Sequence, residues 1–407
     1  MKAGSYFLFC VPAIFASVPL SAARGASTEV IYSFAGGQDG EYADTDLVMD
    51  GAGNIYGTSV QGGAHGSGTV WRLSPEGNTW THTVLYSFTG GADGGEPYKG
   101  VTLDVDGNLY GTAVTGGGGT CEGGCGVAYK LTNNGGTWTQ RVIHQFNGPD
   151  DGQGPGARLT IGDDGDIYGM APTGGEFGAG TIYQMHATRH GWNFKVIHAF
   201  TGGADGCGGS AGAMIVRGGS LYGASTACGA NGAGLIYGLT PNQKGKFKFK
   251  ILYAFKGEPD GSFPYGGLMF DAKGNIYGTT YYDGEDEVGA VYELSPKDRG
   301  EWKERELYSF KDNGSDGASS ISNLVQDASG NLYGTTSAGG TSNLGTIFKL
   351  TSGAHHSWTE SVVHSFGGPP DGAFAYNGMV GDGSGVFYGS TTHGGEDDEG
   401  AIYKFTP

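Results

Sequence analysis

The sequence predicts an all-β fold, a seven-bladed β-propeller with four antiparallel strands in each blade, closed by pairing of the N- and C-terminal strands. Three observations lead to this prediction. A unit of about 55 residues recurs seven times, each unit contains four strand-like segments, and the first and last units complement each other. One four-stranded sheet cannot bury both of its faces, whereas seven sheets arranged radially can.

The repeat is defined by a phenylalanine, an Asp-Gly pair and a Tyr-Gly pair in fixed order. From the phenylalanine to the tyrosine the spacing is 22 residues in six copies and 23 residues in the other. Such self-similarity is typical of repeat architectures. The copies begin near residues 30, 84, 142, 196, 251, 306 and 362, and their phenylalanines are Phe34, Phe88, Phe146, Phe200, Phe255, Phe310 and Phe366.

Each copy offers four short segments with strand character. In the second copy these are residues 100–105, 108–114, 126–131 and 137–146. Asp-Gly-Asn joins the first two segments, and Asn-Asn-Gly-Gly joins the last two, both of which are typical of tight hairpin turns. No segment shows helical periodicity over ten residues. A β-helix is the alternative, but its coils are usually shorter and lack these hairpins.

The two ends of the chain complete one blade between them. The last copy stops after residues 401–405 and lacks its fourth strand, while residues 29–34 form a strand with no blade of its own. We therefore expect residues 28–34 to pair beside residues 400–405. This pairing would hide two strand edges and close the ring.

The N-terminus resembles a secretory signal. Lys2 provides a positive charge, residues 6–20 are apolar, and Ser21-Ala22-Ala23 offers small residues for cleavage. We predict a signal peptide over residues 1–23, with cleavage near 23–26, and a single propeller over residues 24–407. No later segment is apolar enough to span a membrane, and we expect no C-terminal anchor. The predicted location is secreted, periplasmic or extracellular, and the predicted state is a monomer.

Charge and cysteine content narrow the class of protein further. The chain has 41 acidic and 23 basic residues, a net charge of −18, which disfavours nucleic-acid binding because phosphates would be repelled. Gly accounts for 83 residues, as expected for many tight turns. Four cysteines follow the signal, an even number that indicates disulfides in an oxidising compartment. From their positions in the predicted loops, we predict the pairs Cys121–Cys125 and Cys207–Cys228.

The repeat resembles a known family. The succession Tyr-Ser-Phe, Asp-Gly, Gly-Asn-Leu-Tyr-Gly-Thr, Gly-Gly and Gly-Thr-Ile-Phe-Lys-Leu is similar to the bacterial GloVer-type tandem repeat, and the similarity covers essentially the whole chain after the signal. The resemblance implies an exported repeat protein that is often associated with the cell surface. It supplies no catalytic residues.

Functional residues are expected on the face that carries the longer and more variable loops. The Asp-Gly pairs place one aspartate per copy on this face, which indicates either a ring of ligands or, as we favour, a turn that the carboxylate stabilises. Two acidic loops depart from the repeat and are candidates for a Ca²⁺ site or for acid–base chemistry. Their residues are Asp283, Glu285, Asp286 and Glu287 in copy five, and Glu396, Asp397, Asp398 and Glu399 in copy seven.

Variable aromatic residues follow the Asp-Gly pair in several copies and are candidates for stacking on sugar rings or for packing their own loops. They are Tyr42, Tyr98, Phe263, Tyr265, Phe374 and Tyr376. No cofactor is required by any motif, and Ca²⁺ is the one ion that the sequence suggests.

Three hypotheses for function follow. The leading one is a non-catalytic recognition or scaffold propeller that binds a glycan, a peptide or a surface partner. The alternatives are a metal-assisted polysaccharide hydrolase or lyase that uses the carboxylates of copies five and seven, and a purely structural envelope protein. Carboxylates that converge on one central pocket would favour the enzyme, whereas charges scattered over the surface would favour binding.

Overall fold

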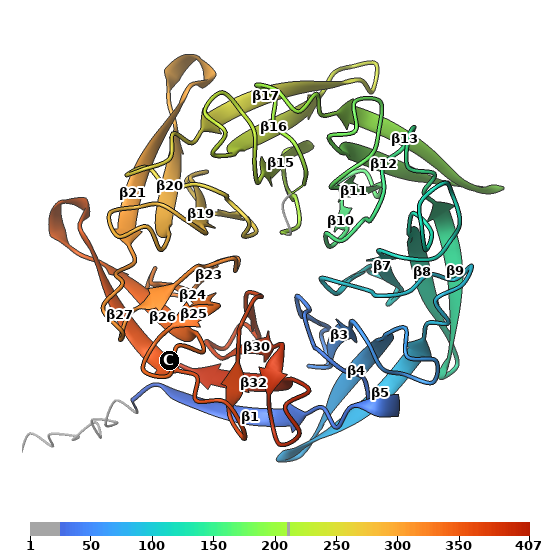
Figure 1. Cartoon of the computed structure of the whole chain (residues 1–407), viewed down its shortest axis with the longest axis horizontal. Helices are drawn as coiled ribbons and strands as arrows, with labels where there is room; N and C mark the ends of the chain where they lie inside the picture. Colours follow the sequence, from blue (N-terminus) through green and yellow to red (C-terminus); the bar gives the residue numbers. More distant parts are fainter. Residues whose placement is uncertain (1–24, 210–211) are drawn as a thin grey trace, which may run out of the picture.

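The chain forms a closed ring of seven blades in the computed structural model, which describes residues 25–209 and 212–407. The blades are arranged around a central axis, and in blades one to six the strands run outward in chain order, with the last strand at the outer rim, whereas the outer strand of blade seven is β1 (Ser27–Ser33) (Figure 1). The predicted seven-bladed propeller is therefore confirmed. The predicted signal peptide lies outside the described residues.

The first four blades have identical strand order along the chain. Blade one contains β2 (Val48–Met49), β3 (Ile55–Ser59), β4 (Thr69–Glu76) and β5 (Thr79–Ser87). Blade two contains β6 (Val101–Leu103), β7 (Leu109–Ala113), β8 (Val127–Asn134) and β9 (Thr137–Gln145). Blade three contains β10 (Thr160–Ile161), β11 (Ile167–Ala171), β12 (Thr181–Thr188) and β13 (Gly191–Ala199), and blade four contains β14 (Ile215–Arg217), β15 (Ser220–Ser225), β16 (Leu235–Pro241) and β17 (Phe247–Ala254).

Blade five has the same strand order, whereas blades six and seven add short strands in their loops. Blade five contains β18 (Met269–Phe270), β19 (Ile276–Thr280), β20 (Ala290–Pro296) and β21 (Trp302–Ser309). Blade six contains β23 (Val325–Gln326), β24 (Leu332–Thr336), β26 (Thr346–Ser352) and β27 (Trp358–Ser365), with β22 (Gly317–Ala318) paired to β25 (Ala338–Gly339). Blade seven contains β29 (Val380–Gly381), β30 (Phe387–Thr391) and β32 (Ala401–Thr406), with β28 (Gly372–Ala373) paired to β31 (His393–Gly394). Short 3₁₀ turns cover Gly37–Asp39, Asp298–Gly300 and Ala354–His356.

The N-terminal strand closes the ring. Strand β1 (Ser27–Ser33) pairs antiparallel with β32, from Ser27 opposite Thr406 to Ser33 opposite Ala401. It thereby takes the outer position in blade seven, with the sheet order β1-β32-β30-β29. This is the predicted pairing, and it joins the first strand of the chain to the last.

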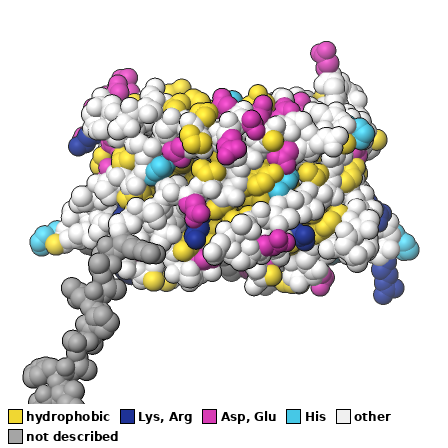
Figure 2. Space-filling view, turned by 90° about the horizontal axis from the view of Figure 1, so that it is seen from below, with side chains coloured by type: hydrophobic (Ala, Val, Ile, Leu, Met, Phe, Trp, Pro, Cys, Tyr) yellow, Lys and Arg dark blue, Asp and Glu magenta, His cyan; other side chains and the backbone are white. Residues whose placement is uncertain are grey.

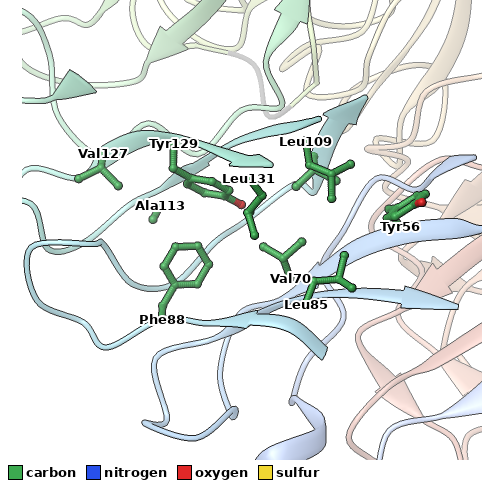
Figure 3. Packing of buried hydrophobic residues seen from close by; sticks show 10 residues of the cluster. Tyr56, Val70, Leu85, Phe88, Leu109, Ala113, Val127, Tyr129 and Leu131 are labelled. Atoms are coloured by element: carbon green, nitrogen blue, oxygen red, sulfur yellow. The ribbon is translucent and has the colours of Figure 1, made fainter. Parts of the chain in front are cut away.

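The hydrophobic core lies between neighbouring blades. Figure 3 shows Val70 and Phe88 from the first blade and its outgoing loop packed against Leu109 and Tyr129 of the second blade. The same kind of cluster recurs at the other boundaries. The glycine after each repeat tyrosine makes room for a ring of the neighbouring strand. At Gly111, for example, an added Cβ would collide with the Tyr129 ring, so a larger residue is excluded.

The charge on the side of the disc is predominantly acidic. Figure 2 shows Asp and Glu side chains spread over this side, with fewer Lys and Arg between them, in line with the net charge of −18. In the described part of the chain, no helix is long and apolar enough to cross a membrane.

Candidate functional site at the propeller axis

The seven Asp-Gly aspartates hold the loops together at the outer rim. The Asp39 carboxylate accepts a hydrogen bond from the Tyr32 hydroxyl at 2.6 Å and another from the Ala35 backbone N–H at 2.9 Å. In the other copies a tyrosine or histidine at the same strand position contacts the aspartate, by a hydrogen bond in all of them except His198, which lies 3.4 Å from the Asp205 carboxylate. These pairs are Tyr86–Asp93, His144–Asp151, His198–Asp205, Tyr253–Asp260, Tyr308–Asp316 and His364–Asp371. The structural interpretation of the ring of aspartates is therefore correct.

From each such aspartate the chain crosses one face of the disc toward the axis, and we call this the loop face. Midway across, one residue per copy adopts a left-handed backbone, for example Tyr42 with φ 58° and Phe374 with φ 58°. Its N–H donates to a carbonyl of the preceding blade's loop, as from Phe374 to Leu344 O at 2.8 Å. Such strain persists only where the surrounding structure holds it. The inter-blade hydrogen bond provides that support and fixes where these side chains lie.

Close to the axis, the copies carry different residue types at equivalent repeat positions. Three tyrosines and one aspartate occupy the same repeat position, three residues before the first buried aliphatic residue of the inner strand region. They are Asp44, Tyr98, Tyr265 and Tyr376, which precede Leu47, Val101, Leu268 and Met379. Because the repeat position is shared, these side chains belong to one level around the axis.

Tyr98 and Tyr265 line a pocket of about 230 Å³, which we call the axial pocket. Lys99 and Met170 also contribute to its wall, together with Gly156, Ala157, Pro172 and Gly209. Residues of blades two, three, four and five therefore meet here. Mostly apolar walls with a few polar groups are typical of small-molecule sites.

A buried cation lies at the wall of the axial pocket. Lys99 is 8% exposed, and its ammonium group donates to Asp44 Oδ1 at 2.6 Å and to Asn377 Oδ1 at 3.0 Å. Asn377 Nδ2 donates in turn to Asp44 Oδ1 at 3.0 Å. This network joins blade two to blades one and seven. Lys99 also has φ 58°, a left-handed conformation that its counterparts in the other described copies do not share.

Asp46 lies close enough to this network for the charges of Arg158, Lys99 and Asp44 to act on its carboxyl. Burial raises the pKa of the Asp46 carboxyl, and Asp44 acts in the same direction, whereas Arg158 and Lys99 oppose the increase. The Arg158 Nε atom is buried and has no hydrogen-bond partner among the described residues. A buried donor without a partner costs free energy, so it is a group that a ligand can satisfy.

The two acidic loops lie in blades five and seven, which blade six separates. The Asp398 carboxylate accepts a hydrogen bond from Gly394 N–H at 2.8 Å, just as the neutral Asn343 accepts one from Gly339 N–H at 2.9 Å in blade six. Asp398 is thus used within its own turn. Burial and the neighbouring Glu41 raise the pKa of Glu399. In residues 25–209 and 212–407 no group of three or more His, Cys, Asp and Glu side chains is arranged to hold a metal ion.

Ca²⁺ binding by the acidic loops of blades five and seven stays a prediction. Glu396 borders an open cavity at the outer rim together with residues of β1. Asp283 bridges to Val288 within its own loop, and Glu285 N–H donates to the Ser309 hydroxyl at 2.7 Å. None of these contacts directs the loops toward the axial pocket.

The predicted aromatic residues are distributed over the loop face. Tyr98 and Tyr265 line the axial pocket, and Tyr376 shares their repeat position. Tyr42 and Phe374 both contact the His393 ring, with centroids 5.2 and 5.7 Å away. Phe263 stacks on Tyr265, and Phe374 stacks on Tyr376.

Sequence reasoning missed the polar network and two further tyrosines. The sequence did hold one indication of this network. The residues at these repeat positions differ from those of the other copies at Lys99, Asp44 and Asn377. Tyr281 and Tyr282 depart in the same way after a Tyr-Gly-Thr-Thr segment.

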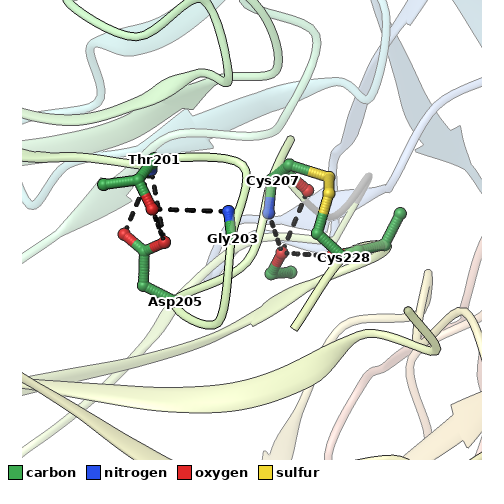
Figure 4. The surroundings of a disulfide bond; sticks show 7 residues. Thr201, Gly203, Asp205, Cys207 and Cys228 are labelled. Carbon is green, nitrogen blue, oxygen red and sulfur yellow. Dashed lines mark hydrogen bonds between the residues drawn. A yellow bond between two sulfur atoms is a disulfide. The ribbon is translucent and has the colours of Figure 1, made fainter. Parts of the chain in front are cut away.

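Both predicted disulfides are present. Cys121 and Cys125 lie within one loop of blade two, with Cα atoms 5.1 Å apart. The Cys207–Cys228 bond joins two loops of blade four (Figure 4). The Ser225 hydroxyl accepts a hydrogen bond from Cys207 N–H and donates one to Cys207 O, both at 2.9 Å. Disulfides of this kind indicate an oxidising environment outside the cytoplasm.

The fold and the axial site define a seven-bladed propeller with a central pocket on its loop face. Residues 18–217 and 209–407 match the Gloeobacter/Verrucomicrobia repeat, and the chain belongs to this family. No curated protein matches the chain significantly.

Two solved structures share the fold. A crystal structure of a protein from Lactobacillus plantarum is 14% identical, with a TM-score of 0.53, over 83% of this chain and 88% of that chain. A candidate 6-phosphogluconolactonase from Bacteroides fragilis is also 14% identical, with a TM-score of 0.53, over 86% of this chain and 88% of that one. At this identity the similarity shows the fold alone.

Proposed function

We propose that the protein is an exported recognition propeller that binds a glycan in the axial pocket. The observation that carries this proposal is the combination of Tyr98 and Tyr265 with the buried Lys99 in one pocket. A sugar ring presents apolar C–H groups on its faces and hydroxyls around its edge. Tyrosine rings match the apolar faces and have a polar end, while a network of donors and acceptors matches the hydroxyls.

The polar network is held together by its own hydrogen bonds. Lys99, Asp44 and Asn377 hold one another at 2.6 to 3.0 Å, so their orientation is fixed before binding. Preorganised polar groups bind more tightly, because less ordering is needed on binding. The left-handed backbone of Lys99 is a strain that supports a role in function at this position.

A panel of purified polysaccharides tests the proposal, with binding and product release measured on the same samples. We expect binding to at least one polysaccharide and a loss of roughly tenfold or more in affinity for Tyr98→Ala and for Tyr265→Ala. Phe177→Ala is the matched control, because this ring is 54% exposed and lies in a loop of blade three away from the pocket lining. Unchanged binding by both pocket variants, or binding to none of the panel, contradicts the proposal and favours a structural envelope role.

A second candidate function is cleavage of the bound glycan. Glycoside hydrolysis uses one protonated carboxyl and one ionised carboxylate. Asp46, whose pKa burial raises, lies near Asp44 at the axis. Product release from a bound polysaccharide, abolished by Asp46→Asn while binding persists, would support this function. Binding without product release supports recognition.

A further inference from the structure

Four aromatic side chains of blade five form one continuous cluster, which we call the aromatic platform. It consists of Phe263, Tyr265, Tyr281 and Tyr282. The Tyr265 and Tyr281 ring centroids are 5.6 Å apart, and those of Tyr281 and Tyr282 are 4.4 Å apart. Phe263 lies 5.8 Å from Tyr282 and 6.4 Å from Tyr265. The four rings therefore form a closed set of contacts.

The aromatic platform leads from the axial pocket to the surface. Tyr265 lines the pocket at one end, and Tyr282 is 48% exposed at the other. The two segments that carry the rings are hydrogen-bonded to each other, with Ser262 N–H donating to Tyr282 O at 3.0 Å and Tyr281 N–H donating to Phe263 O at 3.1 Å. Phe263 is held by a hydrogen bond to Ala233 O at 3.0 Å in the preceding blade. The platform is thus fixed to the fold.

The fold does not require these tyrosines. The other copies have smaller or non-aromatic residues at the position of Tyr281, and only one has an aromatic ring at the position of Tyr282. The counterparts of Tyr281 are Val60, Val114, Pro172, Thr226, Ser337 and Thr392, and those of Tyr282 are Gln61, Thr115, Thr173, Ala227, Ala338 and His393. Five of the six other blades have no ring at the position of the half-exposed Tyr282, so this ring needs an explanation other than packing.

We propose that the aromatic platform extends the axial pocket into a linear site, so that the ligand is a neutral polysaccharide chain rather than a single sugar. This inference rests on the proposed glycan-binding function. A pocket of about 230 Å³ is smaller than the roughly 300–1,000 Å³ of sites for drug-sized ligands, so it has room for about one sugar unit, and the following units of the same chain then lie along Tyr281 and Tyr282. The net charge of −18 favours a neutral chain, because a polyanion would be repelled.

The experiment compares oligosaccharides of increasing length. Dissociation constants are measured by calorimetry for cello-, xylo- and malto-oligosaccharides from dimer to hexamer, with the wild type, Tyr282→Ala and Tyr282→Phe. We expect the wild-type affinity to rise with length in one of the three series. Tyr282→Ala should weaken the longer members by roughly three- to tenfold, the size expected for one aromatic contact, and should leave the dimer unchanged. Tyr282→Phe keeps the ring and should bind as the wild type does.

The outcomes separate this inference from the function on which it rests. If Tyr265→Ala abolishes binding while Tyr282→Ala weakens all lengths equally or none, the axial pocket binds a glycan and the linear site is wrong. A wild-type affinity that does not rise with oligosaccharide length would also show that the linear site is wrong. If no oligosaccharide binds the wild type in any series and the polysaccharide panel is also negative, both proposals fail together.

Discussion

The glutamate Glu304 should make the ring more stable when it is protonated. It extends from the outer strand β21 of blade five toward Asp260, which belongs to the loop after blade four. Its Oε1 atom is buried without a hydrogen-bond partner among the described residues. Burial, together with Asp260 and Glu306, raises its pKa from 4.5 to about 7, although Lys256 and Lys303 act in the opposite direction.

The sign and size of the effect follow from this shift. A carboxyl whose folded-state pKa is raised contributes stability below its unfolded pKa of 4.5, and that contribution is lost as the pH rises through about 7. The full shift corresponds to about 3 kcal/mol. Since the side chain is partly exposed, solvent screening reduces this, and we expect a cost of about 1–2 kcal/mol above pH 8.

The substitution Glu304→Gln removes the charge and keeps the shape. We expect it to raise the free energy of unfolding in urea by about 1–2 kcal/mol at pH 8.5 and to change it little at pH 4. Glu301→Gln is the control, because Glu301 is exposed on the preceding turn. An equal gain at both pH values, or no gain at pH 8.5, would refute the reasoning. Glu360 lies beside Asp316 in the same way, with burial raising its pKa to about 7, and should behave alike.

Three further predictions concern closure, crosslinks and ions. Deleting residues 24–34 removes β1 and unpairs β32, so the melting temperature should fall sharply, and an unchanged value would show that the termini do not close the ring. Replacing Cys207 and Cys228 with serine should cost about 3 kcal/mol of unfolding free energy on the chain-entropy model, more than replacing Cys121 and Cys125, whose loop spans a sequence separation of 4 rather than 21. Four consecutive carboxylates at positions 396–399 repel one another, so millimolar Ca²⁺ should raise the melting temperature and Asp397→Asn with Asp398→Asn should abolish the rise, whereas no shift would show that Asp398 serves only its own turn.

The architecture could be predicted because its signals are local and repeated seven times. Each Asp-Gly aspartate contacts a tyrosine or histidine seven residues earlier in the chain, or eight in the case of Asp316, so the sequence shows the whole unit. The strand β1 could be placed because the last copy lacks its fourth strand. Repetition thus reveals the fold, because a residue type that occurs in every copy is most simply explained by a structural role in every blade.

The axial site could not be assembled in the same way. Lys99 is separated from Asp44 by 55 residues and from Asn377 by 278 residues, and only ring closure brings the three together. The acidic loops of copies five and seven also depart from the repeat. They do not form one site, because blade six lies between them and because Asp398 bonds within its own turn. Residues that depart from the repeat are informative when they occupy positions that face the axis. The sequence alone does not show which positions face the axis, because this depends on the fold.

A crystal structure of the protein with a bound oligosaccharide from the best-binding series would show directly where the glycan lies. We expect one sugar ring against Tyr98 and Tyr265, with a hydroxyl within hydrogen-bond distance of the Lys99, Asp44 and Asn377 network, and further units over Tyr281 and Tyr282. An oligosaccharide bound at the outer rim or at the acidic loops, with the axial pocket free of sugar, would contradict this expectation.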